Sequence, residues 1–194
     1  MAITFILLAA NEDANYLRES LQCLIDGMQF GDRLMVVVDD GYNYRFDNVF
    51  RQFQITPLNH KLNNDFAAHR NWCLDRVETE YTFFLDCDEW ISWRHLQHLH
   101  SIINNNDVDA VEFIRINPMV PGKAAMPDNI DMYSFQNFPD KQVRLFRSKY
   151  RYSGKLHEGI VINKERILST NVPIIHVKDT DRALQQRLYY ETLK

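Results

Sequence analysis

At residues 81–89 the chain reads Tyr81-Thr82-Phe83-Phe84-Leu85-Asp86-Cys87-Asp88-Glu89, a short apolar run that leads directly into three acidic residues. A continuous apolar run of this length is typical of a strand covered on both faces. We therefore expect a buried strand at Tyr81–Leu85. If the extended backbone persists, Asp86 and Asp88 point to the same face, because side chains alternate along a strand.

Two apolar runs upstream also end beside acidic residues. Ile3–Leu8 is followed by Asn11 and Glu12, and Arg33–Val38 is followed by the turn sequence Asp39-Asp40-Gly41. Parallel sheets bind their ligands outside the carboxyl ends of their strands. We therefore expect the acidic residues that follow these three strands to converge on one cleft.

Helices are expected between the strands, from apolar residues at helical spacing and from capping residues. They should cover Asn15–Ile25, about Asp47–Phe53, about Phe66–Val77 with Asp65 as the cap, and Ser92 to about Asn104. Short strands are expected near Gln54–Pro57 and at Ala110–Ile114. This alternation predicts an α/β fold with a Rossmann-like, mostly parallel central sheet flanked by helices.

The second half of the chain has a weaker pattern. Asn117–Phe138 has no clear period and predicts a long loop. Strands are expected at Gln142–Phe146, Gly159–Ile162 and Ile174–Val177, and a terminal helix at Asp181–Leu193. The length of 194 residues suits a single domain, 1–194.

Composition excludes several classes of function. The net charge is −4 and no block of Lys and Arg stands out, so long-range attraction to nucleic acid is not indicated. Three cysteines match no zinc pattern and favour a reducing compartment. The apolar N-terminus lacks a preceding Lys or Arg, and no stretch approaches the ~18 apolar residues of a membrane span. We expect a cytoplasmic protein, which would lie at the inner face of a membrane if the molecule it acts on is membrane-bound.

Paired carboxylates at a strand end are hard oxygen ligands for Mg²⁺ or Mn²⁺. A cation held by Asp86 and Asp88 could neutralise a departing diphosphate. The alternative is an acidic turn after a strand, which is common. His176, within an apolar run, could be a further ligand or a satisfied core residue.

Other candidates carry equally open alternatives. Glu158 could be a general base beside the cleft or a surface acid. Arg70 could bind a phosphate or a pyrimidine edge, or could lie on a solvated helix face. Arg144 and Arg147 could grip a diphosphate or cover a sheet edge. For the histidines at positions 95, 98 and 100 we favour a solvated helix face over a metal site, since no acid or cysteine completes a set.

Several motifs, taken together, resemble family 2 glycosyltransferases of the GT-A fold, and most of all the branch that contains lipopolysaccharide-core β-glucosyltransferases. The motifs stand in the family's order across nearly the whole chain, and the stretch from Asp65 to Glu89 is the most specific. They are Asn11-Glu12, Val37-Val38-Asp39, Asp65–Asn71, Phe84–Glu89, Arg144–Arg147, Gly154–Glu158 and His176.

The resemblance implies roles for these residues. Asp88, assisted by Asp86 and His176, would hold Mn²⁺ or Mg²⁺ on the diphosphate of a nucleotide sugar. Glu158 would be the general base of an inverting transfer to an acceptor hydroxyl, with Asp140 as the rival candidate. Residues 1–115 would bind the donor, usually a UDP-sugar, and residues 116–194 a glycan or lipid-linked acceptor. The implied donor-binding residues are Asn11, Glu12, Asp39, Asp40, Arg70, Asp86 and Arg144.

The chain also departs from the family pattern. The segment Asp39-Asp40-Gly41-Tyr42-Asn43-Tyr44 replaces the usual loop, His69 stands where Gln is common, and Cys87 where Ala is common. The chain ends soon after His176, so we expect no longer acceptor-binding tail. Three rival functions stay open: a metal-dependent nucleotidyltransferase, an inactive nucleotide-sugar binder, and sugar transfer to a nucleic-acid base in a viral setting.

Overall fold

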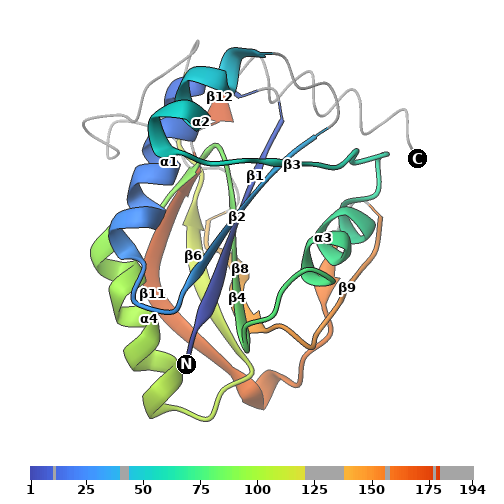
Figure 1. The fold of residues 1–194 in the computed structure, drawn as a ribbon. Helices are drawn as coiled ribbons and strands as arrows, with labels where there is room; N and C mark the ends of the chain where they lie inside the picture. Colours follow the sequence, from blue (N-terminus) through green and yellow to red (C-terminus); the bar gives the residue numbers. More distant parts are fainter. Residues whose placement is uncertain (11, 40–43, 121–137, 156–157, 177, 180–194) are drawn as a thin grey trace.

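The computed structural model describes residues 1–10, 12–39, 44–120, 138–155, 158–176 and 178–179 (Figure 1). Its centre is an eight-stranded sheet in the order β3-β2-β1-β4-β8-β6-β11-β5. Along the chain these strands are β1 Ile3–Ala9, β2 Arg33–Val38, β3 Leu58–Asn59, β4 Tyr81–Asp86, β5 Glu89–Trp90, β6 Ala110–Ile116, β8 Asp140–Arg147 and β11 Ile167–His176.

The four strands β3, β2, β1 and β4 are parallel, and β6 is parallel to β11. Strand β8 lies antiparallel between β4 and β6, and β5 is antiparallel to β11. The predicted α/β fold with a mostly parallel sheet is therefore confirmed. The antiparallel β8 joins the two parallel parts, so that its start at Asp140 faces the end of β6.

Helices cover both faces of the sheet. The helices are α1 Ala14–Gly27, α2 Asp47–Phe53, α3 Phe66–Leu74 and α4 Trp93–Asn105, with short 3-10 turns η1 Tyr44–Phe46 and η3 Lys164–Arg166. Helices α1 and α4 lie side by side on one face, and α3 lies on the opposite face beside β9, Tyr152–Ser153 (Figure 1). A Cβ on Gly27 would lie 2.5 Å from Leu96 Cβ, so glycine allows α1 to approach α4 this closely.

The alternation of side chains along β4 explains why its apolar run is continuous. Phe83 and Leu85 join the core beneath α1 and α4, whereas Phe84 packs on the other face with Cys73 and Leu74 of α3. Both faces are therefore buried, as the apolar run predicts. The acids that follow lie at the carboxyl end of the strand.

Several local predictions differ from the structure. The strand expected near Gln54–Pro57 is wrong: Gln54 has a left-handed φ of 55° at the end of α2, and pairing begins only at Leu58. Helix α3 ends at Leu74 rather than Val77, because Val77 N–H donates to the carbonyl of Leu74 in a tighter turn. The expected Gly159–Ile162 strand is shorter, as β10 covers Gly159–Ile160 and pairs with β9.

The predicted strand Ile174–Val177 is the end of a longer one. Strand β11 already begins at Ile167 and continues past a register shift between Ser169 and Pro173. Within the predicted loop, β7, Met119–Val120, pairs with β12, Lys178–Asp179. The predicted terminal helix and residues 121–137 lie outside the described residues. Within the described part of the chain, no helix is long and apolar enough to cross a membrane.

His100 is buried, which corrects the expected solvated position for this histidine. Its Nε2 lies 2.9 Å from Asp32 Oδ2 and its Nδ1 lies 3.1 Å from the carbonyl oxygen of Met1. Burial raises the pKa of Asp32, but hydrogen bonds from His100 and from the N–H groups of Gln29 and Ile3 outweigh it and leave the pKa below its usual value.

We predict that Asp32→Asn lowers the free energy of unfolding by about 1–3 kcal/mol at pH 7, because it removes the buried carboxylate that accepts hydrogen bonds from His100, Gln29 and Ile3. Since the folded pKa of Asp32 lies below the unfolded value of about 3.9, its contribution is present above that pH and lost as pH falls through the folded pKa. Urea unfolding followed by circular dichroism from pH 3 to 7 measures both effects.

The matched control is Asp75→Asn, which removes an exposed ion pair with Arg151 and should cost less than about 1 kcal/mol. Equal losses in the two variants would show that the buried pair does not hold α4 to the start of β1.

Candidate active site

Asp86, the last residue of β4, binds two buried guanidinium groups. Arg70 Nη2 of α3 lies 3.0 and 3.2 Å from its carboxylate oxygens, and Arg144 Nη1 of β8 lies 3.4 Å from Oδ2. Burial alone raises the pKa of Asp86, but Arg70 and then Arg144 lower it far below its usual value. The carboxylate is ionised and already engaged, which suits a structural anchor better than a principal metal ligand.

Glu89 extends this cluster and is completely buried. Its Oε1 accepts hydrogen bonds from Arg144 Nη2 and, at 3.3 Å, from Arg115 Nη1 of β6. Its Oε2 accepts the backbone N–H of Asp86 at 3.1 Å. Sequence reasoning quoted Glu89 only as part of a motif. A sequence signal for Glu89 does exist. It is an acid that follows a buried strand, in a chain whose later strands carry Arg115 and Arg144 as possible partners.

Arg70 lies in the interior, so the alternative of a solvated helix face is wrong for it. Its Nε donates to Glu158 Oε1 at 3.0 Å while its Nη2 holds Asp86. The guanidinium carbon lies 5.2 Å from the ring centre of Phe84 and 5.6 Å from that of Tyr152. Among the described residues, the buried Arg70 Nη1 and Arg144 Nε have no hydrogen-bond partner.

Asp88, which precedes β5, lies beside His176, the last residue of β11. His176 Nε2 lies 3.4 Å from Asp88 Oδ2, and the two side chains are 15% and 20% exposed. The pairing of β5 with β11 places His176 opposite Glu89. Two of the three predicted metal ligands therefore meet, and the third, Asp86, lies next to them on the arginine side.

Asp140, the rival candidate base, is held by several donors. Arg115 Nε and Asn117 Nδ2 donate to its Oδ2 at 2.8 and 3.0 Å, and Gln142 Nε2 donates to Oδ1 at 2.6 Å. Burial raises the pKa of Asp140, but these hydrogen bonds and the Arg115 charge lower it below its usual value. Both oxygens are engaged, which disfavours proton abstraction by Asp140.

Other predicted residues lie at the ends of β1 and β2. Glu12 is buried and its Oε2 accepts the N–H of Ala10. Asp39 Oδ1 accepts the N–H of Leu62 at 2.8 Å. Asn11 and Asp40 lie outside the described residues. Arg147 lies at the opposite end of β8, beside Tyr81 at the start of β4, so it is not part of this site.

A histidine pair beside Asp39 was missed by sequence reasoning. His60 Nδ1 lies 2.9 Å from His69 Nδ1, and the His60 ring stacks on Trp72 with centroids 4.1 Å apart. Burial, and then the neighbouring His60, lower the pKa of His69 to about 4, so its ring is neutral at physiological pH. No spacing rule connects residue 60 with residue 69, because the contact depends on how β3 packs against α3.

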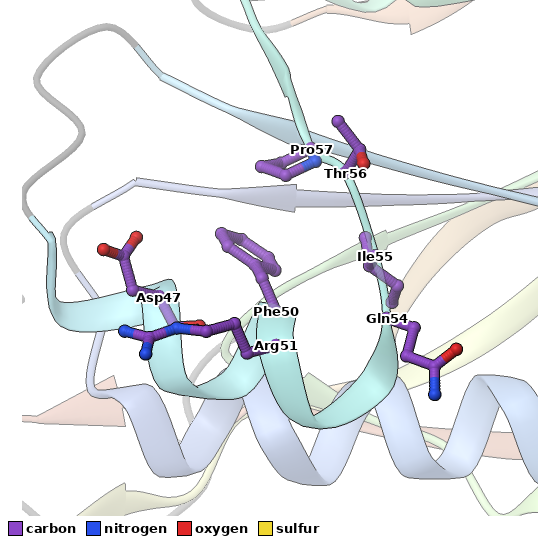
Figure 2. Close-up of a pocket in the computed structure, with 7 residues that line it drawn as sticks. All are labelled: Asp47, Phe50, Arg51, Gln54, Ile55, Thr56 and Pro57. Carbon is purple, nitrogen blue, oxygen red and sulfur yellow. The ribbon is translucent and has the colours of Figure 1, made fainter.

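A separate pocket of about 510 Å³ lies between α2 and the segment leading to β3 (Figure 2). Its lining contains none of the predicted site residues; it comprises Asp47, Phe50, Arg51, Gln54, Ile55, Thr56 and Pro57. The candidate site is therefore defined by the charged cluster at the strand ends and not by this cavity.

The mixed α/β sheet agrees with the predicted GT-A fold. Residues 4–169 match the model of the glycosyl transferase family 2, which covers more than half of the chain. The chain therefore belongs to that family. A sequence search among curated proteins gave no match.

Solved structures of similar fold include S. aureus TarS 1–349 in two complexes. The complex with UDP has a TM-score of 0.52 at 14% identity, and the match covers 90% of this chain and 60% of that one. The complex with UDP-GlcNAc has a TM-score of 0.54 at 15% identity, and the match covers 90% and 58%. The chain thus spans about three fifths of those structures, and identity at this level supports the fold alone.

We predict that Asp86→Ala and Asp88→Ala differ sharply in stability. Removing Asp86 leaves Arg70 and Arg144 without their shared carboxylate, at a cost of about 3–5 kcal/mol in the free energy of unfolding. Removing the partly exposed Asp88 should cost less than about 1 kcal/mol. Urea unfolding at pH 7 measures both, and the reverse order would make Asp88 the structural acid.

Proposed function

We propose that this chain transfers a sugar from a nucleotide-diphosphate sugar, most simply a UDP-sugar, to an acceptor hydroxyl with inversion at the anomeric carbon. The observation that carries the proposal is the meeting of Asp88 and His176 beside the Arg70–Asp86–Arg144 cluster. A carboxylate and an imidazole at a strand end, with cationic groups next to them, suit a metal-bound diphosphate.

The Asp88–His176 pair fits a divalent cation, Mn²⁺ or Mg²⁺. The separation of 3.4 Å is longer than a charge-assisted hydrogen bond, and it lets both atoms reach one ion. Among the described residues, no group of three or more His, Cys, Asp and Glu side chains could hold a metal. A site with two protein ligands agrees with ions that also bind substrate phosphates instead of an all-protein cage. When bound, the ion would stabilise negative charge on the departing diphosphate.

Glu158 is the proposed general base. Arg70 holds its Oε1 at 3.0 Å, which fixes the carboxylate and leaves Oε2 without a partner among the described residues. The side chain is 17% exposed, so a hydroxyl can approach it. In this mechanism the acceptor hydroxyl attacks the anomeric carbon, its proton passes to Glu158, and the bond from that carbon to the diphosphate oxygen breaks.

Arg70 and Arg144 are proposed to position the acids of the site. Asn11, Glu12, Asp39 and Asp40 would line the nucleotide end of the site. TarS, which is similar in fold, binds UDP and UDP-GlcNAc, and by analogy we propose a uridine donor here. Residues 1–115 would bind this donor and residues 116–194 the acceptor.

We propose that the acceptor is a glycan or a lipid-linked molecule of the cell envelope, at the cytoplasmic face of a membrane. The net charge of −4 disfavours nucleic acid as the acceptor. Membership of the family favours sugar transfer over nucleotidyl transfer. The resemblance to the lipopolysaccharide-core branch agrees with an envelope glycan, and assay of purified lipopolysaccharide fractions as acceptors tests it.

We predict that UDP binds more tightly with Mn²⁺ than without it, because the ion links the diphosphate to Asp88 and His176. In Asp88→Ala the gain from Mn²⁺ should disappear, and sugar transfer should be abolished. Isothermal titration of UDP with and without Mn²⁺ measures the gain. Equal affinities in the two conditions for the wild-type protein would contradict a metal bridge.

We predict that Glu158→Gln lowers kcat about 10²–10⁴-fold, because the amide keeps the shape but cannot accept the proton. Donor affinity should change little. The matched variant is Asp140→Asn, which should weaken metal-dependent donor binding and retain most of kcat at saturating donor and Mn²⁺. If Asp140→Asn lost kcat under those conditions and Glu158→Gln kept it, the role of base would pass to Asp140.

A further inference from the structure

We infer that Asn117 is a positioning residue that sets the tautomer and ring orientation of His176, and that Asp140 sets the orientation of Asn117. The inference rests on the proposed function, because the purpose it gives to His176 is metal binding. Asn117 and Asp140 would act without touching the substrate or the ion. Asp140 would then orient Asn117 and would not be a general base.

The amide of Asn117 is held from both ends. Asn117 directly follows β6 and is buried, at 2% exposure. Its Nδ2 donates to Asp140 Oδ2 at 3.0 Å, and its Oδ1 lies 3.0 Å from His176 Nδ1. An ionised carboxylate only accepts hydrogen bonds, so the NH₂ end of the amide must face Asp140. The carbonyl end therefore faces His176.

This orientation decides which nitrogen of His176 carries the proton. The amide oxygen of Asn117 can only accept, so His176 Nδ1 must be the N–H. In the neutral ring Nε2 then presents its lone pair, and it is this atom that lies 3.4 Å from Asp88 Oδ2. Histidine ligands of metals commonly donate their other N–H to a neighbouring acceptor, which fixes the tautomer.

The opposite orientation of Asn117 would prevent metal binding by His176. An NH₂ group against Nδ1 would require a lone pair there and would place the proton on Nε2, toward Asp88. Asp140 opposes this flip because its Oδ2 would then meet the amide oxygen. Arg115 in turn holds Asp140 and also binds Glu89, so the buried cluster around Asp86 continues to His176.

The tautomer can be measured in the metal-free protein by NMR with ¹⁵N-labelled histidine, using His176→Gln to identify the resonances of His176. In the wild type at pH 8 we expect a protonated Nδ1 and an unprotonated Nε2. A proton fixed on Nε2 would overturn the inference.

The variant Asn117→Ala tests the contact between Asn117 and His176, and Asp140→Asn tests the contact between Asp140 and Asn117. Asn117→Ala should give a mixture of tautomers and weaken Mn²⁺ binding in the presence of UDP about 10–100-fold. Asp140→Asn should have the same effects to a smaller degree, since its amide can pair with Asn117 in either orientation. The exposed Asn163→Ala, remote from His176, is the control and should change neither quantity.

An unchanged Nδ1–H signal and unchanged Mn²⁺ affinity in Asn117→Ala would overturn the inference. Failure of the proposed function has a different signature. In that case wild-type UDP binding is independent of Mn²⁺, whereas the tautomer of His176 still responds to Asn117.

Discussion

The carboxylate of Asp86, held between Arg70 and Arg144, is the interaction on which the candidate site depends. It joins α3, β4 and β8, three elements from distant parts of the chain, at the carboxyl end of the parallel strands. Buried charges are stable only when they are paired and hydrogen-bonded. Each guanidinium group therefore fixes the acids around it, and the loss of Asp86 removes the one carboxylate that Arg70 and Arg144 share.

From this centre the ion pairs extend in two directions. On one side Arg70 holds Glu158, the proposed base. On the other side Arg144 and Glu89 lead through Arg115 to Asp140, and through Asn117 to His176. A rigid set of charges holds reacting groups in place without reorganisation, which is the property that electrostatic catalysis requires. The same cluster thus contacts both the proposed base and, through Asn117, the proposed metal ligand.

Local features of the fold could be predicted because they depend on neighbouring residues. The apolar run of β4, the cap at Asp65 and the bounds of β2 follow from side-chain pattern and turn chemistry. The antiparallel insertion of β8 could not be predicted, since pairing between β4 and β8 depends on chain segments about 60 residues apart. At Gln54 a left-handed helix end overrode a pattern that resembled a strand.

Predictions at the site show the same division between what local sequence predicts and what depends on distant contacts. Motif resemblance pointed to Asp88 and His176, which the structure brings together. The burial of Arg70 was unexpected, because an arginine on a helix is usually solvated and its partner Glu158 lies 88 residues away. Asn117 carries no signal by itself: its role depends on Asp140 and His176 meeting it from two other strands.

The most direct test of the central claim is anomalous diffraction at the manganese edge from crystals grown with UDP and Mn²⁺. The account predicts a single anomalous peak within coordination distance of Asp88 and of His176 Nε2, next to the diphosphate, with Asp86 still bound to Arg70 and Arg144. A peak on Asp86 with its arginines displaced, or ordered UDP without any peak near Asp88, would contradict it.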